Sequence, residues 1–216
     1  METLDNNAEA FFYTHKKLSK EYTSKLYFFM AHAAKALKYI HSKGIVHCDI
    51  TPSQFMVHDD VVKLADLGSA KRTGEPTLMM MVTPGFSVKR FPSKIDPCLD
   101  MYAMGKTVAR ILLPTTGLNY QQCCEIMRNE NDEKLLGRLR RAHVSEYLLG
   151  NIIQNCLESA TPGKGINAED LEKKVEMFGA IYDVQDRVQV RIELYSGKKR
   201  TLIIPAYKAL MEQQPL

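Results

Sequence analysis

Apolar side chains recur at steps of three and four residues early in the chain. This spacing is typical of a helix with one apolar face. Ser19 is suited to the N-cap and Gly44 to the position just past the end, so the pattern predicts a helix from about 20 to 43. The positions that mark the apolar face are Tyr22, Leu26, Phe29, Ala33, Leu37 and Ile40.

Short apolar runs separated by loops follow this helix. Ile45–Val46 precedes a proline-containing loop. Apolar residues at 55–57 and 61–64 stand on either side of Asp59–Asp60, which predicts a β-hairpin. From 68 to 94 glycine and proline recur, so no long element is expected there. A loop of this length inside a compact domain is often functional.

Further helices are expected in the second half of the chain. The stretch 100–113 is apolar on nearly every side, which predicts a buried central helix ended by Pro114. Apolar spacing at 144–157 predicts an amphipathic helix. Asn167 is suited to the N-cap of a last helix, and Gly179 is expected to stop it.

The last part of the chain has a different pattern. Apolar and polar residues alternate from Val188 to Leu194, Ser196–Gly197 is suited to a turn, and an apolar run continues to Ile204. This pattern predicts a second hairpin. The patterns together predict a mainly α (α+β) fold, with a helical domain at 1–179 and a C-terminal extension with a β-hairpin at 180–216.

Composition and charge narrow the class of protein. With 45% apolar residues in 216, the chain can bury a core of one ordinary domain. The net charge of +4 is mild and well mixed, so it does not indicate a nucleic-acid binder. The five cysteines form no C-x-x-C pair, which favours reduced thiols in an intracellular, cytoplasmic protein. Neither a signal peptide nor an apolar run long enough for a membrane span is found, and no membrane role is expected.

Four motifs in order carry a family resemblance. The stretch 39–54, YIHSKGIVHCDITPSQ, resembles the catalytic loop of eukaryotic-type protein kinases, H-R-D-L-K-P-x-N, with its preceding helix. LADLG at 64–68 is similar to the D-F-G motif, and TPGF at 83–86 to the T-P-G-Y before A-P-E. DMYAMG at 100–105 is similar to the start of the family's central helix. One such motif would be weak evidence, but four in register are strong.

The resemblance covers about 1–178 and implies the C-terminal lobe of a Ser/Thr protein kinase. Met1–Asp5 reads like the hinge between the two lobes of the family. The family's Gly-rich loop, strand lysine and partner glutamate would lie upstream, and the chain as given contains none of them. We therefore expect a protein-kinase-like C-lobe without its N-lobe.

The resemblance also implies a site for ATP and magnesium. Asp49 matches the carboxylate that orients the substrate hydroxyl, and Asp66 matches the one that holds magnesium against the phosphates. Gln54 replaces a metal-binding asparagine, and Thr51 replaces a lysine near the transferred phosphate. Met56 matches the floor of the adenine site. The expected catalytic residues are thus Asp49, Thr51 and Gln54, the cofactor-binding residues Met56 and Asp66, and the metal ligands Gln54 and Asp66.

Other positions also depart from the family pattern. Cys48 replaces an arginine that pairs with a phosphorylated activation segment in many members. Arg90 stands where the A-P-E glutamate belongs, and Gly165 stands where its arginine partner belongs. Breaking one side of a buried ion pair costs roughly 3–5 kcal/mol, whereas replacing both sides can be nearly neutral. These paired changes indicate a lobe that is folded and adapted.

Two interpretations of the function compete. In one, the chain is a pseudokinase that binds a protein partner over its open cleft, with ATP and magnesium bound weakly or not at all. In the other, it is a truncated fragment of an active Ser/Thr kinase. A nucleic-acid-binding module rests only on basic clusters such as Arg138, Arg140 and Arg141, and is disfavoured.

The partner hypothesis rests on apolar side chains at the open face of the lobe. Leu4, Phe55, Met56 and Leu64 are expected at or near an exposed patch, which monomers rarely leave bare. Self-association is a further possibility, and the terminal hairpin could instead fold back as a lid.

Overall fold

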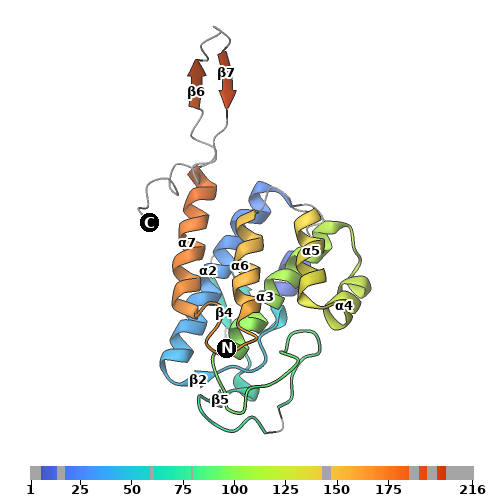
Figure 1. Ribbon diagram of the computed structural model, residues 1–216, viewed down its shortest axis with the longest axis vertical. Helices are drawn as coiled ribbons and strands as arrows, with labels where there is room; N and C mark the ends of the chain where they lie inside the picture. The colour runs from blue at the N-terminus through green and yellow to red at the C-terminus, as the bar shows by residue number, and fades with distance from the viewer. Residues whose placement is uncertain are drawn as a thin grey trace.

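The structure is a computed structural model, and it describes residues 6–13, 18–58, 61–78, 80–142, 147–184, 190–193 and 199–202. Its helices are α1 (Ala8–Tyr13), α2 (Lys20–Ser42), α3 (Cys98–Leu112), α4 (Tyr120–Asn129), α5 (Asp132–Ala142), α6 (Tyr147–Glu158) and α7 (Ala168–Val184). Its strands are β1 (Asn6–Asn7), β2 (Ile45–Val46), β3 (Phe55–His58), β4 (Val61–Leu64), β5 (Lys71–Arg72), β6 (Val190–Glu193) and β7 (Lys199–Leu202). The described residues are therefore mainly helical, with a few short strands (Figure 1).

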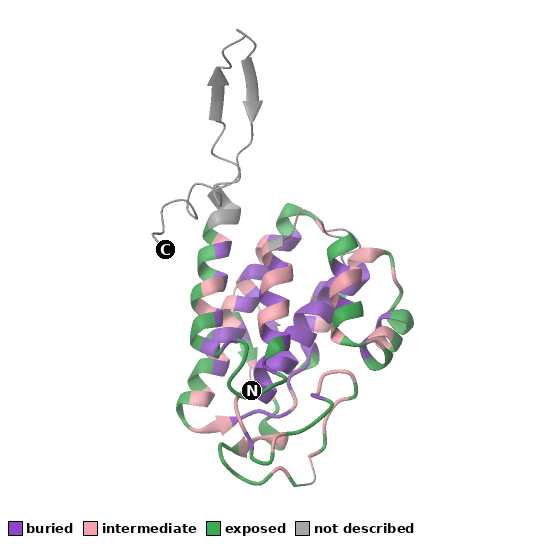
Figure 2. Cartoon of the chain, in the orientation of Figure 1, coloured by how far each residue is buried: buried purple, intermediate pink, exposed green. Residues whose placement is uncertain are grey.

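Helix α3 forms the centre of the core. Every residue from Cys98 to Leu112 is buried, as the unbroken purple of this helix in Figure 2 shows. Gly105 allows α6 to pack closely, because a Cβ atom there would lie 2.7 Å from the Cβ of Cys156. The predicted buried helix at 100–113 is confirmed, and a 3₁₀ turn that contains Pro114 follows it.

Helix α2 packs along α7 (Figure 1). Its start is capped by Ser19, whose Oγ accepts a hydrogen bond from the Tyr22 amide at 3.1 Å. Gly44 follows its end with φ +69°, a conformation that glycine adopts easily. The Tyr22 hydroxyl donates to the Ile111 carbonyl at 2.8 Å and joins α2 to α3. The predicted helix from 20 to 43 is confirmed.

The last helix is longer than its sequence predicts. The Asn167 Oδ1 accepts a hydrogen bond from the Asp170 amide at 2.8 Å, which confirms the predicted N-cap. The predicted stop at Gly179 is wrong, because α7 continues to Val184. A Cβ at Gly179 would lie 3.7 Å from Tyr27, so the glycine lies where α7 passes close to α2. Packing against α2 outweighs the roughly 1 kcal/mol that a helical glycine costs relative to alanine.

Three small antiparallel pairings lie in the first half of the chain. Strand β3 pairs with β4, with Phe55 opposite Leu64, and β1 adds to the free edge of β3. The predicted hairpin is confirmed, although its turn at 59–60 lies outside the described residues. Strand β2 pairs with β5, which the sequence patterns do not predict.

The terminal segments are described only in part. Strand β6 pairs with β7, with Val190 opposite Leu202. Residues 185–189, 194–198 and 203–216 lie outside the described residues, so the C-terminal extension stays a prediction. The segment 1–5, which reads like a hinge, also lies outside them.

Candidate active site

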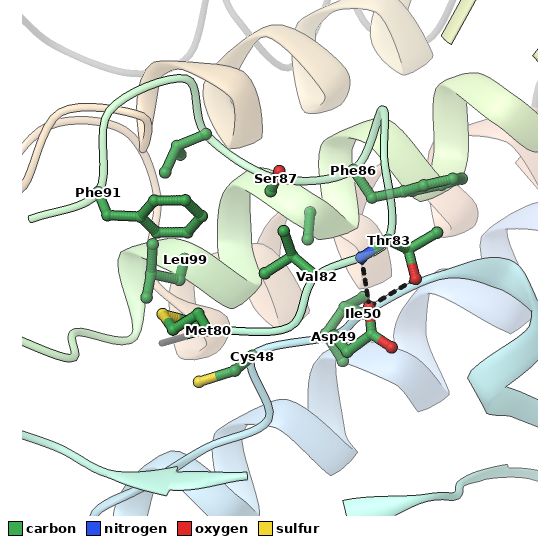
Figure 3. A pocket seen from close by; sticks show the side chains of 12 residues that line it. Cys48, Asp49, Ile50, Met80, Val82, Thr83, Phe86, Ser87, Phe91 and Leu99 are labelled. Carbon is green, nitrogen blue, oxygen red and sulfur yellow. Dashed lines mark hydrogen bonds between the residues drawn. The ribbon is translucent and has the colours of Figure 1, made fainter. Parts of the chain in front are cut away.

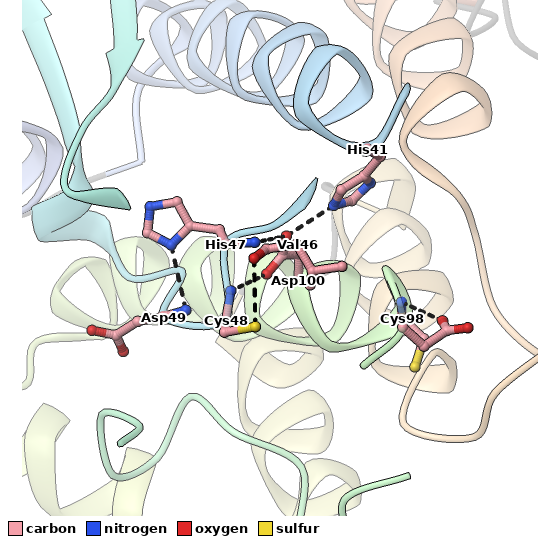
Figure 4. Close-up of polar contacts among 8 residues, drawn as sticks. His41, Val46, His47, Cys48, Asp49, Cys98 and Asp100 are labelled. Atoms are coloured by element: carbon pink, nitrogen blue, oxygen red, sulfur yellow. Dashed lines mark hydrogen bonds and ion pairs between the residues drawn. The ribbon is translucent and has the colours of Figure 1, made fainter. Parts of the chain in front are cut away.

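A buried carboxylate anchors the loop that carries the expected catalytic residues (Figure 4). Asp100 in α3 is fully buried. Its two oxygens accept hydrogen bonds from the His47 amide at 2.7 Å and the Cys48 amide at 2.8 Å. The His41 ring, from the end of α2, lies with Nε2 2.8 Å from the same carboxylate. Hydrogen bonds to a charged acceptor are stronger than neutral ones, so Asp100 fixes this loop on the core.

Backbone strain marks both sides of the site. Cys48 has φ +68° and Asp66 has φ +57°, and they are the two non-glycine residues with positive φ in the described part of the chain. Such conformations cost of order 1–3 kcal/mol each and gather at functional sites. Burial raises the pKa of the Cys48 thiol to about 12, so this thiol stays protonated near neutral pH and is no nucleophile.

Asp49 joins the catalytic loop to the TPGF segment (Figure 3). Its Oδ1 accepts hydrogen bonds from the Thr83 amide at 3.1 Å and from the Thr83 hydroxyl at 2.7 Å. Its second oxygen accepts no hydrogen bond from the residues that the structure describes. A half-buried carboxylate with one oxygen held and one available is suited to orient a hydroxyl group.

A shallow, partly open hollow lies beside Asp49, with about 280 Å³ of space when open solvent is included. In Figure 3 the side chains of Met80, Leu99 and Phe91 gather at one end, and the Asp49–Thr83 contact lies at the other. The lining is thus mainly apolar. Further along the same loop Met81 is 85% exposed, so this loop is only partly packed against the core.

The remaining expected site residues follow Asp49 closely. The Ala65 amide donates to the Gln54 carbonyl at 2.8 Å, which places Asp66 next to Gln54. Asp66 itself is exposed, and its Oδ1 accepts a hydrogen bond from the Gly68 amide at 3.2 Å. Gln54 and Met56 are half-buried at the 3₁₀ turn and strand β3. The His47 Nε2 lies 2.9 Å from the Ala65 carbonyl oxygen, so the segment just before Asp66 lies next to the catalytic loop, and the expected roles of Gln54 and Asp66 stay predictions.

Thr51 lies where the family resemblance places a lysine near the transferred phosphate. Its side chain is 3% exposed, and its hydroxyl shares a hydrogen bond of 2.8 Å with the Ser53 hydroxyl. A threonine carries no charge, so this position supplies no cation to a phosphate group. The loss of the lysine is therefore a real change in the chemistry of the loop.

The residues present fit a magnesium ion only in part. Asp66 offers one carboxylate and Gln54 one amide oxygen, and the described residues contain no group of three His, Cys, Asp or Glu that could hold a metal. Magnesium is usually bound through one or two carboxylates together with phosphates of a substrate. Asp66 would supply one carboxylate, the minimum of this ligand set. Gln54 would supply an amide oxygen on a longer and less rigid side chain than that of asparagine.

The A-P-E position and its partner have changed together. Arg90 is exposed and forms no ion pair with the described residues. At Gly165 the backbone has φ +80°, and a Cβ there would lie 2.2 Å from the Ser159 Oγ. A long side chain therefore has no room at 165. The family resemblance places an ion pair at this position. In this chain Gly165 instead packs closely against Ser159.

Some site residues were not predicted from the sequence, and one expectation is wrong. Thr83, Asp100 and His41 belong to motifs that the sequence analysis recognises, but their contacts with the loop were not foreseen. Phe55 is fully buried, with its ring 5.2 Å from that of Phe29, so it is not part of an exposed apolar patch. Leu4 lies outside the described residues.

No helix among the described residues is long and apolar enough to cross a membrane.

The loop, its anchor and the segment that meets Asp49 define a protein kinase domain. The family model described as "Protein kinase domain" matches residues 1–171, and the chain belongs to this family. The activity of Ser/Thr kinases in this family is the transfer of phosphate to serine or threonine residues of proteins.

Curated relatives are similar at low identity. A probable serine/threonine-protein kinase zyg-1 from Caenorhabditis briggsae is 27% identical over 153 residues, which is 62% of this chain and 21% of that protein. Mitogen-activated protein kinase 11 from Arabidopsis thaliana is 24% identical over 165 residues, 70% of this chain and 45% of that protein. Cyclin-dependent kinase F-4 from rice is 36% identical over 83 residues, 36% of this chain and 18% of that protein. The chain spans less than half of each of these relatives.

Proposed function

We propose that this chain is a pseudokinase: a C-terminal lobe of the kinase family that binds a protein partner and transfers phosphate poorly. The observation that carries the proposal is Thr51, a buried, uncharged residue bonded to Ser53 within the catalytic loop. Phosphoryl transfer depends on positioning and on neutralisation of charge, and this position supplies no charge. The longer ligand at Gln54 adds to the effect.

The role left to each residue follows from its contacts. Asp49 would orient a substrate hydroxyl with its available oxygen. Asp66 and Gln54 would hold magnesium, and Met56 would lie under the adenine of ATP. Magnesium, when bound, neutralises part of the phosphate charge. Because the ligand set is small and Thr51 adds no cation, we expect ATP to bind weakly.

A second candidate function is an active Ser/Thr kinase of which this chain is one part. It is favoured by the hydrogen bonds from Thr83 to Asp49 and by the strained backbone kept at Asp66. Strain of this kind persists only where the surroundings hold it, and it is frequent at working active sites.

Transfer of labelled phosphate from ATP separates the two candidates. We expect the full chain to label a general protein substrate no faster than its Asp49→Ala variant. The double variant Thr51→Lys, Gln54→Asn tests the cause, with Thr73→Lys at an exposed loop position as the matched control. Robust transfer by the unaltered chain, lost in Asp49→Ala, would overturn the pseudokinase proposal and favour the active kinase.

The partner is proposed to cover the face that carries Asp66. On this face Leu67 is 53% exposed, and Met56 and Leu64 are half-buried. An apolar surface of a second protein, or of a second copy of this chain, would complement these side chains. Sedimentation of the pure chain tests the second copy. Self-association that Leu67→Gln relieves, and that Leu78→Gln in the neighbouring loop does not, supports it; a monomer at all concentrations leaves only a different protein.

A further inference from the structure

A long groove lies along the first half of α2, away from the catalytic loop. One part, about 1160 Å³ with open solvent included, lies between α1, α2 and the β3–β4 pair, where Phe11, Val57 and Val62 line it. The other part, about 610 Å³, lies between α2 and α7. Ser24 and Phe28 line both parts, so the two form one continuous groove, called here the α2 groove.

The α2 groove is apolar and shaped by small residues. Ala31 of α2 and Gly179 and Ala180 of α7 line the part between these two helices, where larger side chains would fill it. Lys25 is a basic residue in the lining. Its Nζ lies 2.7 Å from the Glu21 Oε1, and this ion pair largely neutralises its charge. Apolar hollows of this extent are usually covered by another segment or partner. The lining suits an apolar segment without strong charge.

The chain itself supplies such a segment close to the groove. Helix α7 lines the groove up to Ala180 and ends at Val184, about one helical turn further on. Residues 203–216 read IIPAYKALMEQQPL, with Pro205 suited to a first helical turn and good helix formers after it. Apolar side chains recur there at helical spacing: Ile203, Tyr207, Leu210 and Met211.

We propose that residues 203–216 bind in the α2 groove of the same chain as an amphipathic helix. The reach is sufficient. The pairing of Val190 with Leu202 returns the chain to within about six residues of Val184, or about 20 Å when extended. A helix of about ten residues, from Pro205 to the residue before Pro215, spans about 15 Å. Tethering also gives the segment an effective concentration of about millimolar, which favours it over a free partner.

The bound segment has a structural consequence for the site. It would cover the half-buried Phe28 and pack beside Val62, which is already buried, and so would support the β3–β4 pair that carries Met56. The groove contains neither Asp49 nor Asp66, so this inference does not depend on whether the chain transfers phosphate.

A single tryptophan reports the environment of the segment. The chain has no tryptophan, so Tyr207→Trp introduces a unique fluorophore in full-length protein. We expect its emission to lie at shorter wavelength, and its quenching by acrylamide to be several-fold slower, than in a free peptide of residues 203–216 with the same substitution. Values equal to those of the peptide would overturn the proposal.

A second substitution places the segment in the groove. Ser24→Arg, added to Tyr207→Trp, inserts a long charged side chain where the two parts of the groove meet. We expect it to return the emission and quenching to those of the peptide. Ser42→Arg, at the exposed end of the same helix, is the matched control and should change neither. If the short-wavelength emission and slow quenching persist in the Ser24→Arg variant, the segment binds elsewhere. If they strengthen as the protein concentration rises, the groove binds a second copy. Either result contradicts the proposal.

Discussion

The anchor of the catalytic loop and the residues that would meet a nucleotide differ sharply. Around Asp100 the groups are buried, and each carboxylate oxygen accepts at least one hydrogen bond from the loop or from His41. Around Asp66 the side chains of Gln54, Met56 and Leu67 are exposed or half-buried, and the residue types at Gln54 and at the buried Thr51 depart from the pattern that the family resemblance gives. Change at the exposed side costs little stability, whereas change at the anchor leaves buried donors without partners. If the pseudokinase proposal holds, this difference explains how the phosphate chemistry is lost while the buried anchor is kept.

The largest expected effect is at the anchor. Asp100→Ala leaves the buried amides of His47 and Cys48 without an acceptor, at about 1–3 kcal/mol each. We expect the free energy of unfolding to fall by about 2–6 kcal/mol in total, measured by urea denaturation. Asp66→Ala, which removes one exposed carboxylate, should cost no more than about 1 kcal/mol. Equal losses in the two variants would remove the contrast between the regions.

A smaller effect on the free energy of unfolding is expected from alanine substitutions at Gly74 and Gly85, in the long loop at 68–94. Gly74 and Gly85 both have positive φ, +88° and +92°. A Cβ at Gly85 would lie 2.8 Å from the Met127 carbonyl oxygen, whereas nothing lies within 4 Å of one at Gly74. We expect Gly74→Ala to cost about 1–2 kcal/mol through backbone strain alone. Gly85→Ala should cost about 1–3 kcal/mol more, because overpacking adds to the strain. Thermal or urea unfolding of both variants measures this difference, and equal costs would show that Gly85 is not packed against α4.

The smallest expected effect concerns pH and the core. Burial raises the pKa of the Cys156 thiol to about 12, against about 8.5 in an unfolded chain. The unfolded state thus releases its proton first, so the stability from this thiol is full below pH about 8.5 and is lost as the pH rises toward 12. The slope is at most about 1.4 kcal/mol per pH unit.

Substitution of this cysteine tests the sign. Between pH 7.5 and 10 we expect Cys156→Ala to lose about 1–2 kcal/mol less than the unaltered chain, from urea unfolding at each pH. Cys124→Ala, at a half-exposed position of α4, is the matched control and should follow the unaltered chain. A Cys156→Ala variant with the same alkaline loss would show that this thiol is not held protonated by the core.

The long helices could be predicted from the sequence because their patterns are strong. Helix α2 has a sustained apolar face with a cap, and α3 is apolar on nearly all sides. The short helices α1, α4 and α5 were missed, since each buries only two side chains and takes its stability from neighbours in space. Gly179 misled the prediction because its role is contact with Tyr27, which local sequence does not encode.

The same limit applies to the site. The expected roles of Asp66 and Gln54 rest on the family resemblance and stay predictions. The contacts of Thr83 with Asp49 and of His41 with Asp100 join residues 34 and 59 positions apart, so no local pattern contains them. Phe55 was expected at or near an exposed apolar patch because it lies in the first strand pair, on the face that an N-lobe would cover in the family. The ring of Phe29 covers it, and only the fold shows that.

Binding of Mg-ATP to the full chain tests the central claim, a preserved anchor with an altered nucleotide site, most directly. In a calorimetric titration we expect no saturable binding tighter than about millimolar, because only one exposed carboxylate and one amide would hold the metal and Thr51 adds no cation. The Asp66→Ala variant should give the same trace. Micromolar, magnesium-dependent binding that disappears in Asp66→Ala would contradict the account.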